Sequence, residues 1–177
     1  LSRNGTLAYR AGDVRAGFPK QLVWVDRQGK EELLPEPTRD ISIPRISPDG
    51  DRVALNISDN TGIDVWVYDL GRGTFTRLTF DPDWELNPIW SPDGDKIAFT
   101  LYSPKEIRVI SADGSSPSEK IASSEFIATL SSWSPDGKRL VVSQYRRGSH
   151  GSLLWDIRLI DVESGEREWL TSSAKAH

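Results

Sequence analysis

The residues that most often carry out catalysis are scarce in this sequence of 177 residues. There are two histidines, His150 in a polar stretch and His177 at the last position, and there is no cysteine. Neither histidine lies in a Gly-x-Ser-x-Gly or His-Glu-x-x-His motif, which would place a nucleophile or a metal ion beside it. A hydrolase needs a nucleophile, a base and a group that orients the base. We therefore predict that this chain is not an enzyme.

Two acidic segments and one glycine pair could bind ions or phosphate. Asp59-Asn60 and Asp81-Pro82-Asp83 offer oxygen atoms to calcium, but neither has the spacing of a dedicated calcium loop. Gly71-Arg72-Gly73 is expected in a hairpin, whereas a phosphate-binding loop joins a strand to a helix. The sequence therefore predicts no metal ion and no cofactor.

The composition narrows the classes of partner. A net charge of −4 argues against nucleic acid, because a nucleic-acid-binding domain needs a basic face. No apolar run approaches the roughly 20 residues of a membrane-spanning helix, so no membrane insertion is predicted. Hydrophobic residues make up 37% and charged residues 27%, which is typical of a folded globular domain.

An internal repeat provides the main structural signal. The tetrapeptide Ser-Pro-Asp-Gly occurs at 47–50, 91–94 and 134–137, so that its glycines are 44 and 43 residues apart. A related tetrapeptide, Ser2-Arg3-Asn4-Gly5, precedes the first copy by 45 residues. Proline presets φ near −65° and glycine accepts a positive φ, so each copy is expected to form a tight turn between antiparallel strands. The residues assigned to these turns are Asp49, Gly50, Asp93, Gly94, Asp136 and Gly137.

The segments between the turns have the order of a β-propeller blade. Each turn is followed by an apolar strand, a strand that ends near Asp, a glycine turn and a short last strand. Four short strands in about 44 residues are typical of such a blade. We predict an all-β chain of four four-stranded antiparallel blades, the first of which lacks most of its inner strand. Their approximate ranges are 1–34, 41–79, 86–122 and 128–171.

Hydrophobic residues on both sides of a strand support this fold. In Asp64–Asp69 the side chains on both faces are large and apolar, as blades that pack on two neighbours require. Trp90 and Trp133 precede two of the turns at the same position, and Ile46 takes that position before the first. We expect these residues in the core between blades.

These motifs resemble the TolB-like, Pro-Asp variety of β-propeller repeat. The resemblance rests on the Ser-Pro-Asp-Gly turns together with Asp64–Leu70 and Arg77-Leu78-Thr79, and it extends from Ser2 to Thr171. Gln21–Arg27 and Thr79–Pro82 look most like the propellers associated with bacterial receptor kinases. The resemblance implies a non-catalytic protein-interaction, sensor or scaffold propeller, and it favours a periplasmic or other extracytoplasmic bacterial location.

Two other functions stay open. One is the gating propeller of a prolyl-oligopeptidase-type serine peptidase whose catalytic domain is not in this chain. The other is a lyase or hydrolase that works with a metal ion in the central channel, although two histidines hardly supply its ligands. A fold shared by many proteins does not decide between these functions.

A propeller binds its partners with loops, and one set of loops is expected to share a face opposite the Ser-Pro-Asp-Gly turns. Trp84 does not occupy a repeated position, which makes it the best anchor for a protein or peptide partner, with a lid over the blade edge as the alternative. The insertion around Arg146 and Arg147 is either a partner site or a solvated loop. The predicted partner-binding residues are Trp84, Asp81, Asp83, Tyr102, Tyr145, Arg146, Arg147 and His150, and Arg15, Phe18, Asp59 and Asn60 are expected on the same face.

Four blades leave the closure of the propeller undecided. An open arc would expose an apolar face at each end, and such a face is large for a monomer. We expect the chain to be part of a larger propeller, to form a homodimer through its end blades, or to close as a tight four-bladed ring, and we favour self-association over the tight ring.

Overall fold

The computed structural model describes residues 7–11, 20–34, 38–147 and 153–171, and for 7–11, 146, 147 and 153 it describes the backbone alone. These residues form fifteen strands and no helix, which confirms the predicted all-β fold. Accordingly, the described ranges contain no helix that could cross a membrane.

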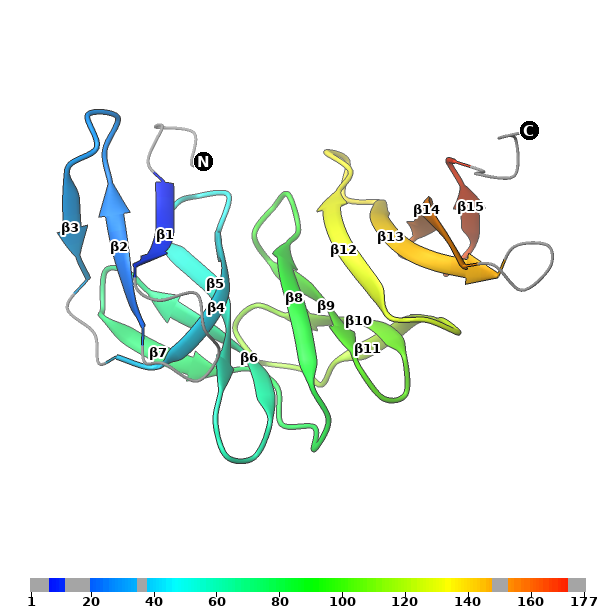
Figure 1. Ribbon diagram of the computed structural model, residues 1–177, viewed down its shortest axis with the longest axis horizontal. Coiled ribbons are helices and arrows are strands. Elements are labelled where there is room, and N and C mark those ends of the chain that lie inside the picture. Colours follow the sequence, from blue (N-terminus) through cyan, green and yellow to red (C-terminus); the bar gives the residue numbers. More distant parts are fainter. Residues whose placement is uncertain (1–6, 12–19, 35–37, 148–152, 172–177) are drawn as a thin grey trace.

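The strands form four antiparallel sheets that follow one another along the chain (Figure 1). The first sheet contains β1 (Leu7–Ala11), β2 (Gln21–Val25) and β3 (Glu31–Leu33). The second contains β4 (Asp40–Ile46), β5 (Arg52–Ser58), β6 (Ile63–Asp69) and β7 (Thr74–Arg77). The third contains β8 (Glu85–Trp90), β9 (Lys96–Leu101), β10 (Glu106–Ser111) and β11 (Glu119–Ser123). The fourth contains β12 (Ala128–Trp133), β13 (Arg139–Arg147), β14 (Leu153–Asp161) and β15 (Arg167–Trp169).

The four sheets stand side by side in an arc, with the first and fourth sheets at opposite ends (Figure 1). The expectation of a tight four-bladed ring is therefore wrong, because the arc does not close. Within the described residues the first sheet has no counterpart of β4, β8 and β12, in agreement with the missing inner strand. The molecule is an open, partial propeller.

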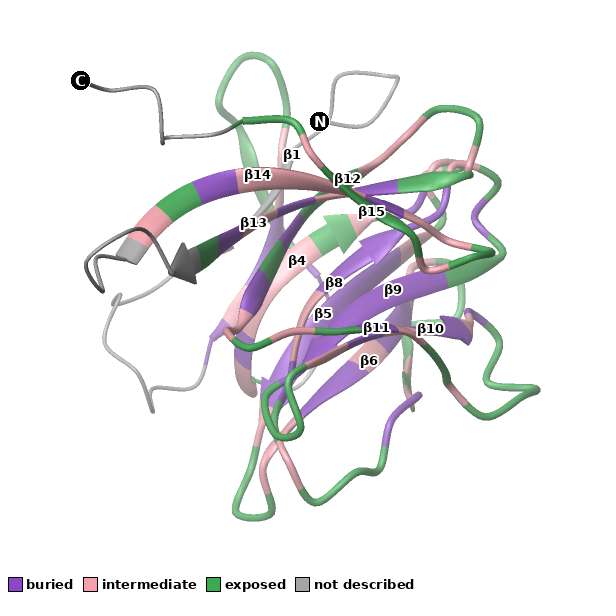
Figure 2. Ribbon diagram, turned by 90° about the vertical axis from the view of Figure 1, so that its right-hand side faces the viewer, coloured by how far each residue is buried: buried purple, intermediate pink, exposed green. Residues whose placement is uncertain are grey.

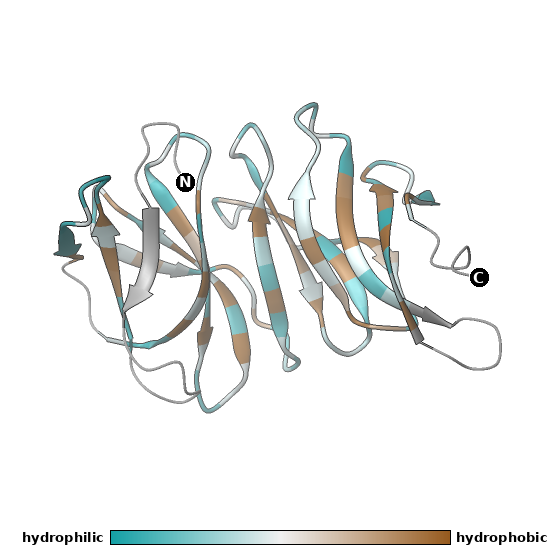
Figure 3. Ribbon diagram, turned by 45° about the horizontal axis from the view of Figure 1, so that its top comes forward, coloured by the Kyte–Doolittle hydropathy of each residue, from teal (hydrophilic) through white to brown (hydrophobic). Residues whose placement is uncertain are grey.

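Hydrophobic clusters fill the spaces between successive sheets. Between the second and third sheets, Val65 and Val67 pack with Trp90 and Phe99. Ala98, the neighbour of Phe99 on β9, belongs instead to the cluster between the third and fourth sheets. Both faces of β9 therefore pack against a neighbouring sheet, and the strand is coloured as buried along most of its length in Figure 2. Figure 3 colours the residues by hydropathy and shows that the hydrophobic positions lie mainly in the strands.

The Ser-Pro-Asp-Gly turns share one set of hydrogen bonds. In the first copy, Ser47 Oγ donates to Asp49 Oδ1, which also accepts the Asp51 N–H at 3.0 Å. The Gly50 N–H donates to the Ser47 carbonyl at 3.0 Å, and the φ of Gly50 is 88°. The same bonds recur in the turns at 91–94 and 134–137. Hydrogen bonds from serine and then from the backbone lower the pKa values of Asp49, Asp93 and Asp136.

An irregular inner strand joins the third sheet to the second. The register of β8 against β9 shifts between Leu86 and Ile89, where Asn87 adopts a φ of 57° that asparagine tolerates well. The Asn87 N–H then donates to Asn56 Oδ1 at 3.2 Å. Asn56 Nδ2 donates to the Glu85 carbonyl at 2.7 Å. Since Asn56 lies on β5 and is fully buried, it fixes the start of the third sheet to the second.

Candidate functional site

The connections between strands divide the molecule into two faces. The Ser-Pro-Asp-Gly turns lie on one side, which we call the turn face (upper side of Figure 1). The connections from β5 to β6, β7 to β8, β9 to β10 and β11 to β12 lie on the other side, which we call the loop face. Antiparallel pairing of four strands in succession dictates this division, because alternate connections emerge at opposite ends.

Trp84 and Tyr102 form an exposed aromatic pair on the loop face. Trp84 is 48% exposed and Tyr102 is 40% exposed. Their ring centroids are 5.3 Å apart at an interplanar angle of 49°, and the Tyr102 N–H donates to the Trp84 carbonyl at 2.8 Å. Beside the indole lies Gly62, where a Cβ atom would be 3.9 Å from Trp84 Cδ1. Connections from the second and third sheets therefore meet at this pair.

Buried charged groups adjoin the connection that carries Trp84. Glu85, the residue after Trp84, is 3% exposed, and Asp64 is 1% exposed. Arg77 Nη2 is 2.8 Å from Asp64 Oδ1. Asp64 Oδ2 and Glu85 Oε2 are both buried and have no other hydrogen-bond partner in the described structure. A single proton between the two carboxyl groups would give both oxygens a partner.

The pKa of Glu85 agrees with a shared proton. Burial raises the pKa of Glu85 to about 7. The charge of Asp64 raises this pKa further, whereas a hydrogen bond from Thr79 lowers it. Glu85 is therefore about half protonated at pH 7. Asp64, Arg77 and Glu85 support the connection that carries Trp84 from the interior of the molecule. The two buried carboxyl groups are not accessible to a ligand on the loop face.

The acidic residues near Trp84 are used in local turns. Asp81 Oδ1 accepts the Asp83 N–H at 3.2 Å, and Asp59 Oδ1 accepts the Thr61 N–H at 2.7 Å. Such side-chain bonds to nearby backbone are the usual role of aspartate in connections. In the part of the chain that the structure describes, no three His, Asp or Glu residues are grouped so that they could hold a metal ion.

Tyr145 belongs to a second aromatic pair. It lies opposite Trp155 in the register of β13 and β14, and the two ring centroids are 4.6 Å apart at 74°. Tyr145 is 43% exposed and Trp155 is 50% exposed. Trp155 was not predicted from the sequence. Counting along β13 from the turn at 134–137 and along β14 back from Asp161 would have placed Trp155 opposite Tyr145.

The remaining predicted binding residues are only partly described. Arg146 and Arg147 lie on β13, where their backbones pair with Leu154 and Leu153. His150, Arg15 and Phe18 lie outside the described residues. The structure thus brings Trp84 into contact with Tyr102 and Tyr145 into contact with Trp155. Asp81 and Asp83 are close to Trp84 in the sequence.

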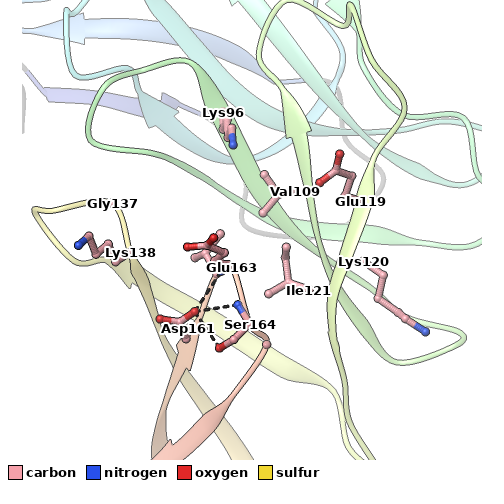
Figure 4. A pocket seen from close by; sticks show the side chains of 12 residues that line it. Lys96, Val109, Glu119, Lys120, Ile121, Gly137, Lys138, Asp161, Glu163 and Ser164 are labelled. Carbon is pink, nitrogen blue, oxygen red and sulfur yellow. Dashed lines mark hydrogen bonds between the residues drawn. The ribbon is translucent and has the colours of Figure 1, made fainter.

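A cavity of about 750 Å³ opens on the turn face between the third and fourth sheets (Figure 4). Its lining combines exposed side chains of both charges, including Lys96, Lys138 and Glu163. Asp161 Oδ1 accepts hydrogen bonds from the Glu163 and Ser164 backbones, so this carboxylate shapes the turn between β14 and β15. The mixture of exposed charges favours no particular ligand.

Comparisons with known proteins agree with the propeller architecture. Residues 27–177 match the family described as the TolB beta propeller domain. The uncharacterized peptidase YuxL of Bacillus subtilis (strain 168) is 32% identical over 136 residues, which are 76% of this chain and 19% of that protein. The chain therefore spans about a fifth of the length of this curated relative.

Solved structures show the same fold. The putative TolB of Agrobacterium tumefaciens has a TM-score of 0.76 and 24% identity over 94% of this chain and 61% of that chain. TolB of Acinetobacter baumannii has a TM-score of 0.72 and 19% identity, with 94% of this chain and 41% of that chain covered. The acylaminoacyl peptidase of Pyrococcus horikoshii has a TM-score of 0.64 and 18% identity, with 97% and 31% covered.

These relatives do not support the expected association with bacterial receptor kinases. The matched range of the family includes all three Ser-Pro-Asp-Gly turns and every strand from β3 to β15. The chain belongs to the TolB β-propeller domain family.

Proposed function

We propose that this chain is a non-catalytic propeller segment that binds a protein or peptide partner through its loop face, with the Trp84–Tyr102 pair at the centre. The observation that carries the proposal is the exposure of two contacting aromatic rings on well-fixed connections. Tryptophan and tyrosine are enriched among the residues that dominate binding energy at protein interfaces.

The surroundings of the pair favour a docking role. The Asn56 side chain bonds to the backbones of Glu85 and Asn87 and so holds the segment that follows Trp84 to the second sheet. Little conformational freedom of this segment is therefore lost when a partner binds. Phe80, in the same connection as Trp84, is 71% exposed, with the Arg77 guanidinium 4.9 Å from its ring. An aromatic centre with an arginine nearby is the composition expected of an interface core.

The proposal is tested by measuring partner affinity with variants of this pair. A partner captured from the source organism is identified and purified, and its dissociation constant is determined for the unmodified chain and for Trp84→Ala. We expect Trp84→Ala to weaken binding by roughly 30-fold, which corresponds to about 2 kcal/mol. The melting temperature should change little, since half of the indole is already exposed.

The matched control is Leu33→Ala, which shortens another exposed apolar side chain on β3 of the first sheet. This variant should bind the partner with unchanged affinity. Equal affinity of Trp84→Ala and the unmodified chain, for every partner captured, would contradict the proposal.

One observation favours a second function, the gating propeller of a serine peptidase. The relative at 32% identity is named as a peptidase, and the chain covers only 19% of it. This function requires a hydrolase domain in the same polypeptide. Its test is to assay the complete gene product with short and long peptides, with and without a serine-directed inhibitor. Hydrolysis that the inhibitor abolishes would favour the gating role.

The cellular location stays a prediction. The resemblance to TolB favours a periplasmic or other extracytoplasmic location, and fractionation of the source organism with an antibody to this chain would test it.

A further inference from the structure

A second cavity, on the loop-face side of the fourth sheet, has polar groups that lack partners. Its volume is about 380 Å³, and it lies between the β11–β12 connection and the strands β13 to β15. Ser124 and Phe126 line it from the connection, and Gln144, Arg158 and Arg167 line it from the sheet. A cavity of this size accommodates a small ligand or the end of a peptide.

The two arginines bring unneutralised positive charge into the cavity. Among the described residues, neither Arg158 nor Arg167 forms an ion pair, whereas Arg108, the counterpart of Arg158 in the third sheet, pairs with Glu106 at 2.8 Å. The Arg158 guanidinium lies 3.9 Å from the centre of the Trp169 ring, and its Nε is buried without an acceptor.

Both arginines line the same cavity. Burial and then the charge of Arg167 lower the pKa of Arg158. Arg167 Nη1 donates to the Ser123 carbonyl at 2.7 Å, which fixes its side chain at the rim. Glu125 is the one acidic side chain among the described residues that line the cavity. Two cations and one anion leave a net positive charge, which favours an anionic ligand.

Gln144 adds a buried acceptor without a donor. It is 3% exposed, and it occupies the position that Ile57 and Leu101 take in the second and third sheets, where both are buried. Gln144 Nε2 donates to Ser124 Oγ at 3.1 Å, but Gln144 Oε1 is buried without a partner in the described structure. A buried acceptor of this kind destabilises the folded chain unless a ligand supplies a donor.

Ser124 supplies one further donor to the cavity. Its Oγ accepts from Gln144 Nε2 and from the Phe126 N–H, so its own proton is free to point elsewhere. The cavity thus offers guanidinium and hydroxyl donors beside one amide acceptor. A matching ligand has an anionic group next to an N–H.

We propose that this cavity binds the carboxyl terminus of a peptide, with Arg158 and Arg167 holding the terminal carboxylate and Gln144 Oε1 accepting the N–H of the last residue. A carboxylate matches the planar fork of a guanidinium, and a terminal residue places its N–H two bonds from that carboxylate. The inference rests on the proposed function as a protein- or peptide-binding propeller, and it names the part of the partner that this cavity would take.

Small probes test the inference on the intact chain by NMR titration. N-acetylglycine carries both the terminal carboxylate and the adjacent N–H, acetate lacks the N–H, and N-acetylglycinamide lacks the charge. We expect N-acetylglycine to shift the side-chain signals of Gln144, Arg158 and Arg167 with a dissociation constant on the order of millimolar. Acetate and N-acetylglycinamide should each bind at least about tenfold more weakly, a difference of about 1.4 kcal/mol.

Matched variants assign the binding to the cavity. Arg167→Gln should abolish the shifts, and because Arg167 is exposed this variant should still fold. Arg139→Gln removes the same charge from β13 at the turn face and should bind N-acetylglycine normally. Equal effects of the two substitutions would overturn the proposal.

The probes also separate this inference from the proposed function. No binding, or equal binding of N-acetylglycinamide, would overturn the carboxylate site, and equal binding of acetate would overturn recognition of a peptide terminus. Trp84→Ala should leave N-acetylglycine binding unchanged, because Trp84 does not line this cavity. The proposal for the cavity and the proposal for the Trp84–Tyr102 pair can therefore be disproved independently.

Discussion

The third and fourth sheets place the same repeat in two different settings. The third sheet has a neighbour on both faces, whereas among the described residues the fourth sheet has one neighbour, the third sheet. Ile107 and Ile157 occupy equivalent positions on β10 and β14, yet Ile107 is 2% exposed and Ile157 is only partly buried. In Figure 2 the buried colour fills most of β9 but is interrupted along β14.

The fourth sheet keeps apolar residues on the face without a neighbour. Val141, Ile157 and Leu159 are all partly exposed there, at the positions that Ala98, Ile107 and Val109 take in the third sheet. The repeat therefore specifies an apolar residue whether or not this chain covers it. Since contiguous exposed apolar surface is unusual in a monomer, we expect another structural unit to cover this face.

The largest contrast is expected at the two repeated tryptophans. Trp90 is 8% exposed, and its Nε1 donates to the Arg45 carbonyl at 2.8 Å. Trp133 is only partly buried, and its Nε1 has no partner among the described residues. Trp90→Ala should lower the free energy of unfolding by about 3–5 kcal/mol, and Trp133→Ala by about 2 kcal/mol or less. Chemical denaturation measures both, and equal losses would show that the fourth sheet is covered.

The equivalent isoleucines should show the next largest difference. Ile107→Ala leaves a cavity between two sheets and should cost about 2–5 kcal/mol of unfolding free energy. Ile157→Ala removes a side chain that is already partly in water and should cost about 1 kcal/mol or less. Both substitutions delete the same atoms, so the difference in denaturation midpoint reports coverage alone. A larger loss at Ile157 would contradict the described arrangement.

The titration of Glu85 in the third sheet should make the folding stability depend on pH. The fourth sheet has no such group, because Ala128 in β12 takes the position of Glu85 in β8. The pKa of Glu85 is raised from 4.5 to about 7, so the folded state binds a proton that the unfolded state releases. This contribution to stability is complete below about pH 4.5 and is lost as the pH rises through 7. At about 1.4 kcal/mol per pKa unit, this contribution amounts to roughly 3–4 kcal/mol.

Denaturation of Glu85→Gln between pH 5 and 8 measures this effect. The glutamine can donate to Asp64 at every pH, so the variant should lose less stability than the unmodified chain as the pH rises. Parallel stability curves for the two proteins would show that Glu85 does not titrate in this range.

The smallest expected effect concerns self-association through the end sheets. We predict that the uncovered face of the fourth sheet pairs with a second copy when nothing else covers it. Leu159→Glu should weaken the dimer at least about tenfold, or about 1.4 kcal/mol, and Arg72→Glu on the second sheet should not. Light scattering across micromolar concentrations measures this, and a monomer throughout would show that the predicted homodimer is wrong.

Much of the fold is predictable because its causes are local. Proline and glycine in each Ser-Pro-Asp-Gly turn restrict φ, and the aspartate and serine bond to atoms within five residues. Alternating residues within each strand then follow from the register that the turn sets. The last strand of a blade is less regular than the others, and β7 (Thr74–Arg77) ends one residue before Leu78. Leu78 still donates to the Val65 carbonyl at 2.9 Å, so pairing continues beyond the regular strand.

The candidate sites depend on contacts between distant residues. Trp84 and Tyr102 were both named from the sequence, but their contact, and the contact of Tyr145 with Trp155, required the folded arrangement. No local pattern distinguishes Gln144 from any other polar residue at the end of a strand. Its burial beside Arg158 and Arg167 becomes visible only when the β11–β12 connection lies against the sheet.

The amino-acid sequence by itself determined the repeat, its turns, the order of strands and the family, because each depends on backbone restrictions and hydrogen bonds within about 44 residues. Only the tertiary structure decided that the arc stays open, that Glu85 lies against Asp64, and which exposed aromatic rings meet. These properties arise from packing between sheets, where burial depends on what lies opposite a residue. The repeat has the same apolar positions in every sheet, so the pattern does not predict which of them a neighbouring sheet will bury.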